Sequence, residues 1–381
     1  MKNFVELIQA VIDERYLTVM NKIAAEKIPA AFFSLNPGFA IEQVKGFRRQ
    51  GLNIVTLIIP DTPREDSDTD FEIVGLGEFA KRHLKPEYVF ATGIDDTRIA
   101  IKNFSGCKIL NLFAPQYSEQ YYNEFINHLP ELYEVYESLI DEESKKTFCG
   151  YWHGRTSSQF DKLVHAIGCH YFTAGFTPKP GDVVIDAGVL DGATSLEFHE
   201  LGCKVYGFEM DRENFKVAKK LADEKGFVVE NFGLGAYEHQ MTYTHAPFGN
   251  PGGSNLNEGG NEVTNIIPLD LYVRQKNIHR VDFIKFDVEG AELDVLKGAA
   301  TTIARCKPIL NISAYHKPDD FRVLMNMVKK IRPDYEFALR HYASSRLDEP
   351  FRRTPEFDKQ MTDLGLEPIV KGYEECCLLA R

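Results

Sequence analysis

The sequence has few of the features that mark a disulfide-bonded, nucleic-acid-binding or membrane-spanning protein. Its seven cysteines are scattered without the C-x-x-C spacing of a zinc or redox site, so we expect free, buried thiols. The 44 Lys and Arg residues are outnumbered by 56 Asp and Glu, which leaves a formal charge of −12 and argues against a nucleic-acid partner. The longest apolar runs, such as residues 30–35 and 55–60, are far shorter than the roughly 18 residues that indicate a membrane span.

The N-terminal segment also lacks the layout of a secretion signal. It carries Glu6, Asp13 and Glu14 in an amphipathic pattern, whereas a signal has a positive segment followed by an apolar one. A cytoplasmic location is the resulting expectation. Hydrophobic residues make up 44% of the chain and aromatic residues 12%, which suits sizeable cores, and a length of 381 residues favours more than one domain.

Three zones of different patterning divide the chain. In residues 1–117, strands are predicted at 30–35, 53–60, 88–92 and 108–113, with helical stretches between them. Such alternation is typical of a parallel sheet covered by helices. Residues 118–175 are rich in aromatics with apolar spacings of three and four, which predicts a helical connector. Residues 176–381 form the third zone.

The third zone contains seven predicted strands, separated mostly by helical patterns. They cover residues 183–186, 204–208, 227–231, 281–287, 308–314, 336–342 and 376–380. This alternation predicts an α/β doubly wound sheet, in which ligands bind beyond the carboxyl ends of the strands. The polar residues at those strand ends are therefore the candidate site residues.

The first of these strand ends carries a glycine turn that begins with a carboxylate. Asp186, Gly188 and Gly192 form a D-x-G-x-x-x-G turn that leads into a helix starting near Ala193. A dinucleotide-binding turn would read G-x-G-x-x-G and hold a diphosphate, which Asp186 would repel. A cationic ligand suits this turn better, and S-adenosylmethionine carries both an ammonium and a sulfonium charge.

The next strand end indicates an adenosine ligand. Glu209 follows Asp186 by 23 residues. A carboxylate at this place in the fold accepts hydrogen bonds from the two hydroxyls of a ribose. Asp211 is instead predicted to be the N-cap of the helix that follows.

The fourth strand carries three further candidates for the chemistry. Period-two alternation places Lys285 and Asp287 on one face, and Glu289 lies in the turn that follows. A lysine in a buried strand should be paired, and Asp287 is its nearest candidate partner, in a site or in an ion pair that caps the sheet. Asp287 and Glu289 could also ligate a divalent ion, but two carboxylates do not define a metal site, so no metal ligand is assigned.

A histidine follows the fifth strand at the same edge of the sheet. His316, in the stretch NISAYHKPDD, is a candidate general base for a substrate hydroxyl, because an imidazole titrates near neutral pH. A hydrogen-bonded structural histidine at a helix start is the alternative. Residues 250–262, rich in Gly and Asn, have the size of a lid over such a site, or of a connector.

Five stretches of the third zone are similar to motifs of a known family: VVIDAGVLDGATS, FEMDRENF, NFGLGA, IPLDLYV and VDFIKFDVEGAELDVLKGA. Through them, residues 178–345 resemble the FkbM-type S-adenosylmethionine-dependent methyltransferases. The resemblance implies a class I methyltransferase fold, a Rossmann-like seven-stranded sheet whose last strand, residues 376–380, is antiparallel. It also implies O-methylation of a hydroxyl, often on a sugar, a glycan or a secondary metabolite.

The same resemblance implies roles for residues at the strand ends. Those implied to contact S-adenosylmethionine are Asp186, Gly188 and Gly192 at the methionine part, Glu209 at the ribose with Met210 beside it, and Asn231 or Phe232 at the adenine. Asp287 and Glu289 would face the sulfonium and the acceptor, with Lys285 and His316 as the other catalytic candidates. Family members often have an acidic residue before the histidine, where this chain has Ala314-Tyr315-His316.

Residues 1 to about 170 lie outside this resemblance. They resemble, more loosely, the Rossmann-like N-terminal modules of sugar-modifying enzymes. Their SLNPGF turn, residues 34–39, has one glycine where a dinucleotide turn needs three, which argues against NAD binding there. A scaffold or substrate-holding role is the expectation, with a scaffold favoured.

Two other functions fit parts of the pattern. A nicotinamide-dependent sugar oxidoreductase would share the sheet and the ribose carboxylate, but both halves lack the G-x-G-x-x-G turn. A scaffold that binds an adenosyl ligand without catalysis would share the whole fold, because function is a property of the site. Detection of a methylated product separates these readings.

Overall fold

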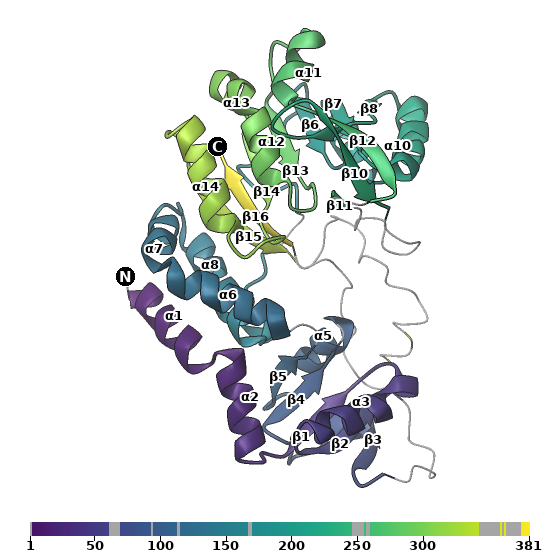
Figure 1. Cartoon of the computed structure of the whole chain (residues 1–381), viewed down its shortest axis with the longest axis vertical. Coiled ribbons are helices and arrows are strands. Elements are labelled where there is room, and N and C mark those ends of the chain that lie inside the picture. The colour runs from purple at the N-terminus through teal and green to yellow at the C-terminus, as the bar shows by residue number, and fades with distance from the viewer. Residues whose placement is uncertain are drawn as a thin grey trace. The chain divides into compact units, whose positions relative to one another are not determined.

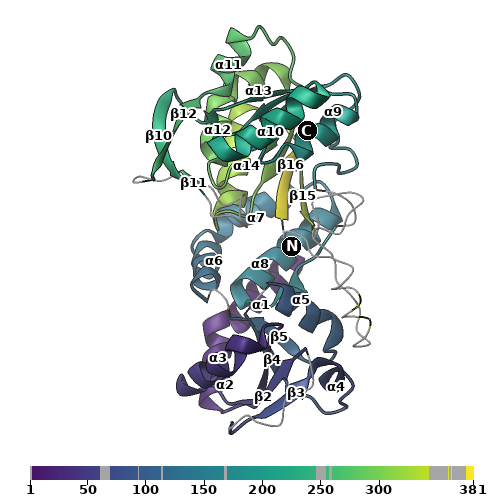
Figure 2. The ribbon, with the colours of Figure 1, turned by 90° about the vertical axis from the view of Figure 1, so that its right-hand side faces the viewer.

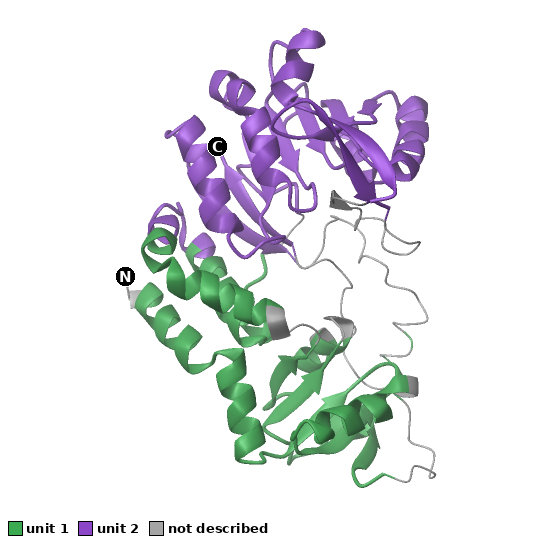
Figure 3. Ribbon diagram, in the orientation of Figure 1, with its two compact units in different colours: residues 1–133, 145–166, 346–374 green, residues 134–144, 167–345, 375–381 purple. Residues whose placement is uncertain are grey.

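A computed structural model describes residues 2–60, 69–92, 94–112, 115–166, 170–245, 255–256, 260–342, 359, 362 and 375–381. The chain forms two compact units, which Figure 3 distinguishes by colour. Unit 1 consists of residues 1–133, 145–166 and 346–374, and unit 2 consists of residues 134–144, 167–345 and 375–381. In the described part of the chain, no helix combines the length and the apolar character that a membrane span requires.

Unit 1 is built around a five-stranded parallel sheet (Figure 1). The strands are β1 (Ala30–Phe33), β2 (Ile54–Ile59), β3 (Glu72–Gly75), β4 (Tyr88–Ala91) and β5 (Lys108–Asn111), in the order β3-β2-β1-β4-β5. The four predicted strands are confirmed, and β3 is an additional one. Connections leave β1 in both directions across the sheet, which is the Rossmann-like arrangement.

Helices cover both faces of this sheet. Successive side chains of β1 alternate between two cores, with Phe32 in one and Phe33 in the other, because side chains in a strand point to opposite faces. The Phe32 core includes residues of α2 (Tyr16–Ala25) and α3 (Pro37–Arg49). The Phe33 core includes residues of α4 (Leu76–Ala80) and α5 (Ile94–Asn103).

The predicted connector is helical, as its apolar spacing indicates. It contains α6 (Pro115–Asn127), α7 (Leu129–Glu137), α8 (Glu142–Ser157) and the short 3-10 helix η1 (Phe160–Lys162). Trp152 of α8 is completely buried against Phe125 of α6, with ring centroids 5.2 Å apart, and Phe4 of α1 (Lys2–Asp13) packs on the same Phe125. Aromatic packing therefore holds α1, α6 and α8 together within unit 1.

Unit 2 contains the seven-stranded sheet that the third zone predicts; Figure 1 labels its strands, and Figure 2 shows β15 and β16 from another side. Its strands are β6 (Val183–Ala187), β7 (Lys204–Phe208), β8 (Val228–Glu230), β13 (Phe283–Phe286), β14 (Ile309–Ser313), β15 (Phe337–Tyr342) and β16 (Glu375–Ala380), in the order β15-β16-β14-β13-β6-β7-β8. The last strand, β16, runs antiparallel to β14 and β15, while β14, β13, β6, β7 and β8 are parallel. The class I methyltransferase fold is confirmed.

The helices of unit 2 pack in two groups. One group is α9 (Ala193–Glu200) with α10 (Arg212–Lys225), whose Phe198, Ala218 and Ala222 join a core with β6, β7 and β8. The other group is α11 (Leu269–Gln275), α12 (Glu292–Gly298), α13 (Ala300–Cys306) and α14 (Asp320–Ile331). Helix α14 buries Phe321, Leu324, Met325 and Val328, the spacing of one face of a helix.

A second, smaller sheet in unit 2 was not predicted. It has the order β11-β10-β12-β9 and consists of β9 (Gly233–Leu234), β10 (His239–Thr244), β11 (Asn255–Leu256) and β12 (Glu262–Ile267). The candidate lid at residues 250–262 overlaps this sheet at β11 and at Glu262. The rest of that segment lies largely outside the described residues, so the choice between lid and connector stays a prediction.

Candidate active site

The turn after β6 makes the closest backbone approach at the carboxyl edge of the sheet. Gly188 has a φ of +85°, and a Cβ atom there would lie 1.7 Å from the carbonyl oxygen of Asp287 at the end of β13. Only glycine fits this place. Gly192 has a φ of +91° and begins α9 as its N-cap. The two glycines of the predicted turn therefore have separate steric reasons, and the turn lies directly against Asp287.

Asp186 is completely buried and paired. Its Oδ1 lies 3.0 Å from Nζ of Lys285, and its Oδ2 accepts a 2.6 Å hydrogen bond from Ser195 of α9. Lys285 also donates to the carbonyl oxygen of Gly188. The expected pairing of Lys285 with Asp287 is corrected here, because the register of β6 and β13 sets Lys285 beside Asp186. The Asp186–Lys285 ion pair therefore holds the Gly188 turn in place, so both charged side chains stabilise local structure.

Glu209 lies at the end of β7 with both carboxylate oxygens bonded to backbone amides. Leu190 donates to Oε2 at 2.8 Å and Asp211 donates to Oε1 at 2.9 Å. Burial raises the pKa of Glu209 to about 7, although these two amides act in the opposite direction. Each oxygen retains a second lone pair that can accept a hydrogen bond from a hydroxyl.

The predicted adenine-side residues lie next to Glu209. The side-chain amide of Asn231 donates to the carbonyl oxygen of Glu209 at 2.8 Å and to that of Met210 at 3.3 Å. Phe232 follows Asn231 and is partly buried. Asp211 caps α10 by accepting hydrogen bonds from the amides of Glu213 and Asn214, which confirms its structural reading. Asn231 thus joins the ends of β7 and β8 around the position expected for an adenosine.

Asp287 lies at the end of β13, across the Gly188 turn from Glu209. Its Oδ2 accepts a 2.9 Å hydrogen bond from the hydroxyl of Tyr171, and its Oδ1 is buried without a hydrogen-bond partner. Burial acts to raise the pKa of Asp287, but the nearby Lys285, the two histidines His316 and His170, and the Tyr171 hydroxyl outweigh it and lower that pKa. Asp287 is therefore an ionised carboxylate with one oxygen left for a ligand.

The turn after β13 adopts a strained conformation that presents Glu289. Glu289 has a φ of +54°, which is uncommon for a residue other than glycine, and Gly290 follows with a φ of +92°. The Glu289 side chain is 34% exposed, and burial raises its pKa to about 7. Lys317, after β14, donates to the carbonyl oxygen of Gly290 and holds this turn.

His316 joins this group from the end of β14. Its Nε2 lies 3.8 Å from Oδ1 of Asp287 and 3.6 Å from Oε2 of Glu289, while its Nδ1 lies 2.9 Å from Oε1 of Glu292. Burial acts to lower the pKa of His316, but Glu292, Asp287 and Glu289 together raise it to about 9. Three carboxylates around His316 therefore hold its pKa above the ordinary value of an imidazole, and its role as general base stays a prediction.

No curated protein is detectably similar in sequence to the chain. Residues 186–341 match the methyltransferase FkbM domain. This domain belongs to the FkbM methyltransferase family. A crystal structure of methyltransferase FkbM from Methylobacillus flagellatus KT has the same fold at 19% identity, with a TM-score of 0.62 and 98% of each chain covered. Fibrillarin from Aeropyrum pernix, solved with bound S-adenosyl-L-methionine, shows a TM-score of 0.30 at 11% identity over 53% of this chain and 67% of its own, too low to support an inference.

The FkbM domain also brings together residues that the sequence reading missed. Four of them come from segments outside the five motifs: His170 and Tyr171 before β6, Asp320 of α14 and Glu375 of β16. The fifth, Glu292 of α12, lies within the motif VDFIKFDVEGAELDVLKGA but had no role assigned to it. His170 stacks on Tyr171 with ring centroids 4.0 Å apart and pairs with Glu375. Burial lowers the pKa of His170 to about 3, so this imidazole is neutral near neutral pH, and burial raises the pKa of Glu375 well above its usual value. The sequence feature that could have indicated Glu375 is its charge at the first position of an otherwise apolar strand.

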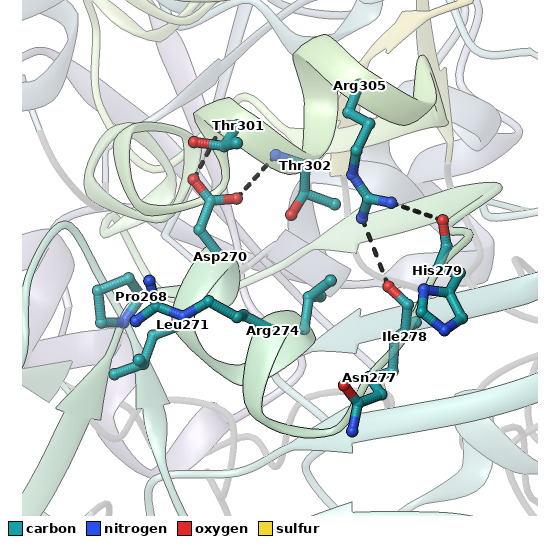
Figure 4. A pocket seen from close by; sticks show the side chains of 11 residues that line it. Pro268, Asp270, Leu271, Arg274, Asn277, Ile278, His279, Thr301, Thr302 and Arg305 are labelled. Carbon is teal, nitrogen blue, oxygen red and sulfur yellow. Dashed lines mark hydrogen bonds between the residues drawn. The ribbon is translucent and has the colours of Figure 1, made fainter.

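The described residues of the FkbM domain contain no group of three His, Cys, Asp or Glu side chains arranged to hold a metal ion. They do contain a hollow of about 550 Å³ between α11 and α13, near the amino end of β13 (Figure 4). Asp270 accepts from the amides of Thr301 and Thr302 there, and Arg305 donates to the carbonyl oxygens of Ile278 and His279. These polar groups hold local structure, and the hollow includes none of the residues at the carboxyl edge.

Proposed function

We propose that the FkbM domain transfers a methyl group from S-adenosylmethionine to a hydroxyl of a sugar, glycan or secondary-metabolite acceptor. The observation that carries this proposal is that Glu209 and Asp287 lie at the ends of β7 and β13, the two strands that flank β6 and its Gly188 turn. The first carboxylate suits a ribose and the second suits a sulfonium and its acceptor. The preference for sugars and related acceptors comes from the family resemblance.

The residues at this edge fit S-adenosylmethionine. Gly188 lets the turn lie directly against the backbone of Asp287, and Oδ1 of Asp287 is a buried oxygen without a hydrogen-bond partner. The carboxylates Asp287 and Glu289 favour a cationic ligand, since Lys285 is already paired with Asp186. A diphosphate would meet the same negative groups, which argues against the nicotinamide-dependent alternative.

The chemistry at the acceptor follows from Asp287 and His316. When S-adenosylmethionine is bound, it supplies a methyl group on a cationic sulfur, which a hydroxyl oxygen can displace in line. Asp287 orients the hydroxyl through Oδ1, and its Oδ2 is held by Tyr171. His316 in its neutral form accepts the hydroxyl proton at Nε2. The main contribution of the protein is alignment, because holding two reactants in the correct orientation lowers the activation barrier by about 7–11 kcal/mol relative to solution.

We infer that unit 1 is a scaffold. The turn after β1 gives support, because its amides are already bonded: Leu35 donates to Oδ1 of Asp96 at 3.1 Å, and Asn36 donates to the hydroxyl of Ser34. The carboxylate of Asp96, which lies in α5 and contacts this turn, opposes a diphosphate. Removal of the Asp96 carboxylate should therefore lower the stability of unit 1 without conferring affinity for NADH, which calorimetry can measure.

Calorimetric titration tests the cofactor. We expect S-adenosylmethionine and S-adenosylhomocysteine to bind with saturation, and NADH not to bind. Glu209→Ala should weaken both adenosyl ligands by about tenfold or more, which corresponds to one lost hydrogen-bonding group. Glu213→Ala is the matched control, because Glu213 is exposed on α10 and pairs with Lys216. Binding of NADH alone would overturn the proposal in favour of redox chemistry.

Transfer of a labelled methyl group tests the reaction. The protein is incubated with methyl-labelled S-adenosylmethionine and separate pools of sugars, glycans and hydroxylated metabolites. Label in a product that resists alkali is expected, because an ether is stable where a carboxyl ester is hydrolysed. Binding of the cofactor with no labelled product from any pool would favour the alternative that the protein binds an adenosyl ligand without catalysis.

A further inference from the structure

Glu292 is a buried carboxylate that the proposed reaction does not yet use. It is the first residue of α12, and 1% of its surface is exposed. Its Oε1 accepts hydrogen bonds from the amides of Val288 at 3.1 Å and Gly290 at 3.3 Å, and the same oxygen lies 2.9 Å from Nδ1 of His316. One carboxylate thus joins the turn after β13 to the residue that follows β14.

This contact decides which ring nitrogen of His316 faces the reaction. A carboxylate has no hydrogen to donate, so the 2.9 Å ion-pair contact with Glu292 favours a hydrogen on Nδ1. Nε2 then points toward Asp287 and Glu289, at 3.8 and 3.6 Å, which is beyond hydrogen-bond distance. Nε2 is therefore the nitrogen left for a substrate hydroxyl.

Titratable groups from several neighbouring elements surround His316. Besides Glu292, they are Asp287 and Glu289 of the β13 end, Asp320 of α14, Glu375 of β16, Lys285 of β13 and His170 before β6. Glu292 is the partner with the shortest contact, and it contributes most to the raised pKa of His316. The remaining carboxylates lie on the Nε2 side or farther away.

We propose that Glu292 is a positioning residue for methyl transfer, which holds the His316 ring so that Nε2 takes the proton of the acceptor hydroxyl. This inference rests on the proposed function. The acceptor oxygen forms a bond to the methyl carbon, the carbon–sulfur bond breaks with its electron pair passing to sulfur, and the hydroxyl proton moves to Nε2. Glu292 touches neither reactant and acts only through His316.

The test is Glu292→Gln in the full-length chain. Glutamine keeps an oxygen that can accept from Val288, Gly290 and His316, but it removes the negative charge. We expect the pH midpoint of His316, followed by NMR of ring-labelled histidine, to fall by about one unit or more. We expect kcat to rise with pH in both proteins, and its rising limb to move by the same amount in the variant, while KM for the acceptor stays within about twofold.

Asp294→Asn is the matched control. Asp294 lies on the same helix, is exposed and pairs with Lys297, so the midpoint of His316 and the kcat profile should both stay in place. If Glu292→Gln does not fold, Glu292→Asp keeps the charge with a shorter reach and is expected to lower kcat more than KM with a high His316 midpoint.

Two results would overturn the positioning role. One is an unchanged His316 midpoint in folded Glu292→Gln, and the other is a shifted midpoint with an unshifted kcat profile. Failure of the proposed function is distinguishable from both results, because in that case the wild-type protein itself yields no methylated product. The NMR titration needs no activity and still decides whether Glu292 holds His316.

Discussion

The hydroxyl of Tyr171 donates a 2.9 Å hydrogen bond to Oδ2 of Asp287. Tyr171 is buried, lies before the first strand of the sheet and stacks on His170, so its hydroxyl is held firmly. The bond leaves Oδ1 of Asp287 as the oxygen directed to a ligand. The orientation of the central carboxylate is therefore set by a residue that lies outside the matched domain.

Tyr171→Phe should lower the rate of methyl transfer. Phenylalanine fills the same volume but cannot donate, and a hydrogen bond to a charged group contributes about 1.5–3 kcal/mol, so kcat should fall by about 10- to 100-fold. Steady-state kinetics measures this change. Tyr335→Phe is the control, since Tyr335 donates a similar buried bond to the carbonyl oxygen of Pro308. Equal kinetics for the two variants would contradict the orienting role.

Asp287→Asn should abolish most turnover while the protein stays folded. The amide keeps the shape but loses the charge that orients the hydroxyl and stabilises the sulfonium, and we expect kcat to fall by about 10²- to 10⁴-fold. Circular dichroism checks folding. Asp282→Asn is the matched control, because Asp282 lies at the opposite, amino end of β13. Its carboxylate accepts a hydrogen bond from the amide of Val183 and pairs with Arg280. Wild-type turnover in Asp287→Asn would remove Asp287 from the mechanism.

The strand ends of the FkbM domain could be predicted because the fold makes them converge. Parallel strands bring their carboxyl ends to one edge, so Glu209, Asp287 and His316 were expected together although they lie far apart in sequence. The Gly188 turn was expected for a related reason, since only glycine permits its conformation.

The contacts that the sequence could not supply depend on register and on distant segments. Alternation along β13 suggested Asp287 as the partner of Lys285, but the neighbouring strand supplies Asp186, and register between strands is not visible in either strand alone. Tyr171 precedes the matched domain in the sequence and Glu375 follows it, so neither could be placed at the site from its motifs. Strand β9 has two residues, too few to show a pattern.

Asp320 should make the stability of the protein depend on pH. Burial raises its folded-state pKa from 3.8 to about 7, while in the unfolded chain it titrates near the ordinary value. Protonated Asp320 therefore favours the folded state below that ordinary value, and this contribution is lost as pH rises from about 4 to 7. Its size is at most about 4 kcal/mol.

Asp320→Asn should flatten this dependence, because asparagine does not titrate and its oxygen can still accept from the amide of Lys317. Thermal unfolding at pH 5 and pH 8 measures the difference, which should be smaller in the variant than in the wild type. Asp294→Asn is the control, because Asp294 is exposed on α12 and pairs with Lys297, so this variant should leave the wild-type difference unchanged. A variant as pH-sensitive as the wild type would show that other carboxyls carry the effect.

Gly188→Ala should damage both stability and cofactor binding, and Gly226→Ala separates the two causes. Both glycines have a positive φ, +85° and +96°, so alanine is strained at either place by about 1 kcal/mol. At Gly226 a Cβ atom meets nothing within 4 Å, whereas at Gly188 it lies 1.7 Å from the carbonyl oxygen of Asp287. Gly188→Ala must therefore push the turn away from β13 and displace Leu190, whose amide bonds to Glu209.

For Gly188→Ala we expect a larger drop in melting temperature than for Gly226→Ala. We also expect at least a tenfold loss of S-adenosylhomocysteine affinity, while Gly226→Ala keeps wild-type affinity. If calorimetry gave the two variants the same affinity, the close approach of Gly188 to Asp287 would serve the fold and not the ligand.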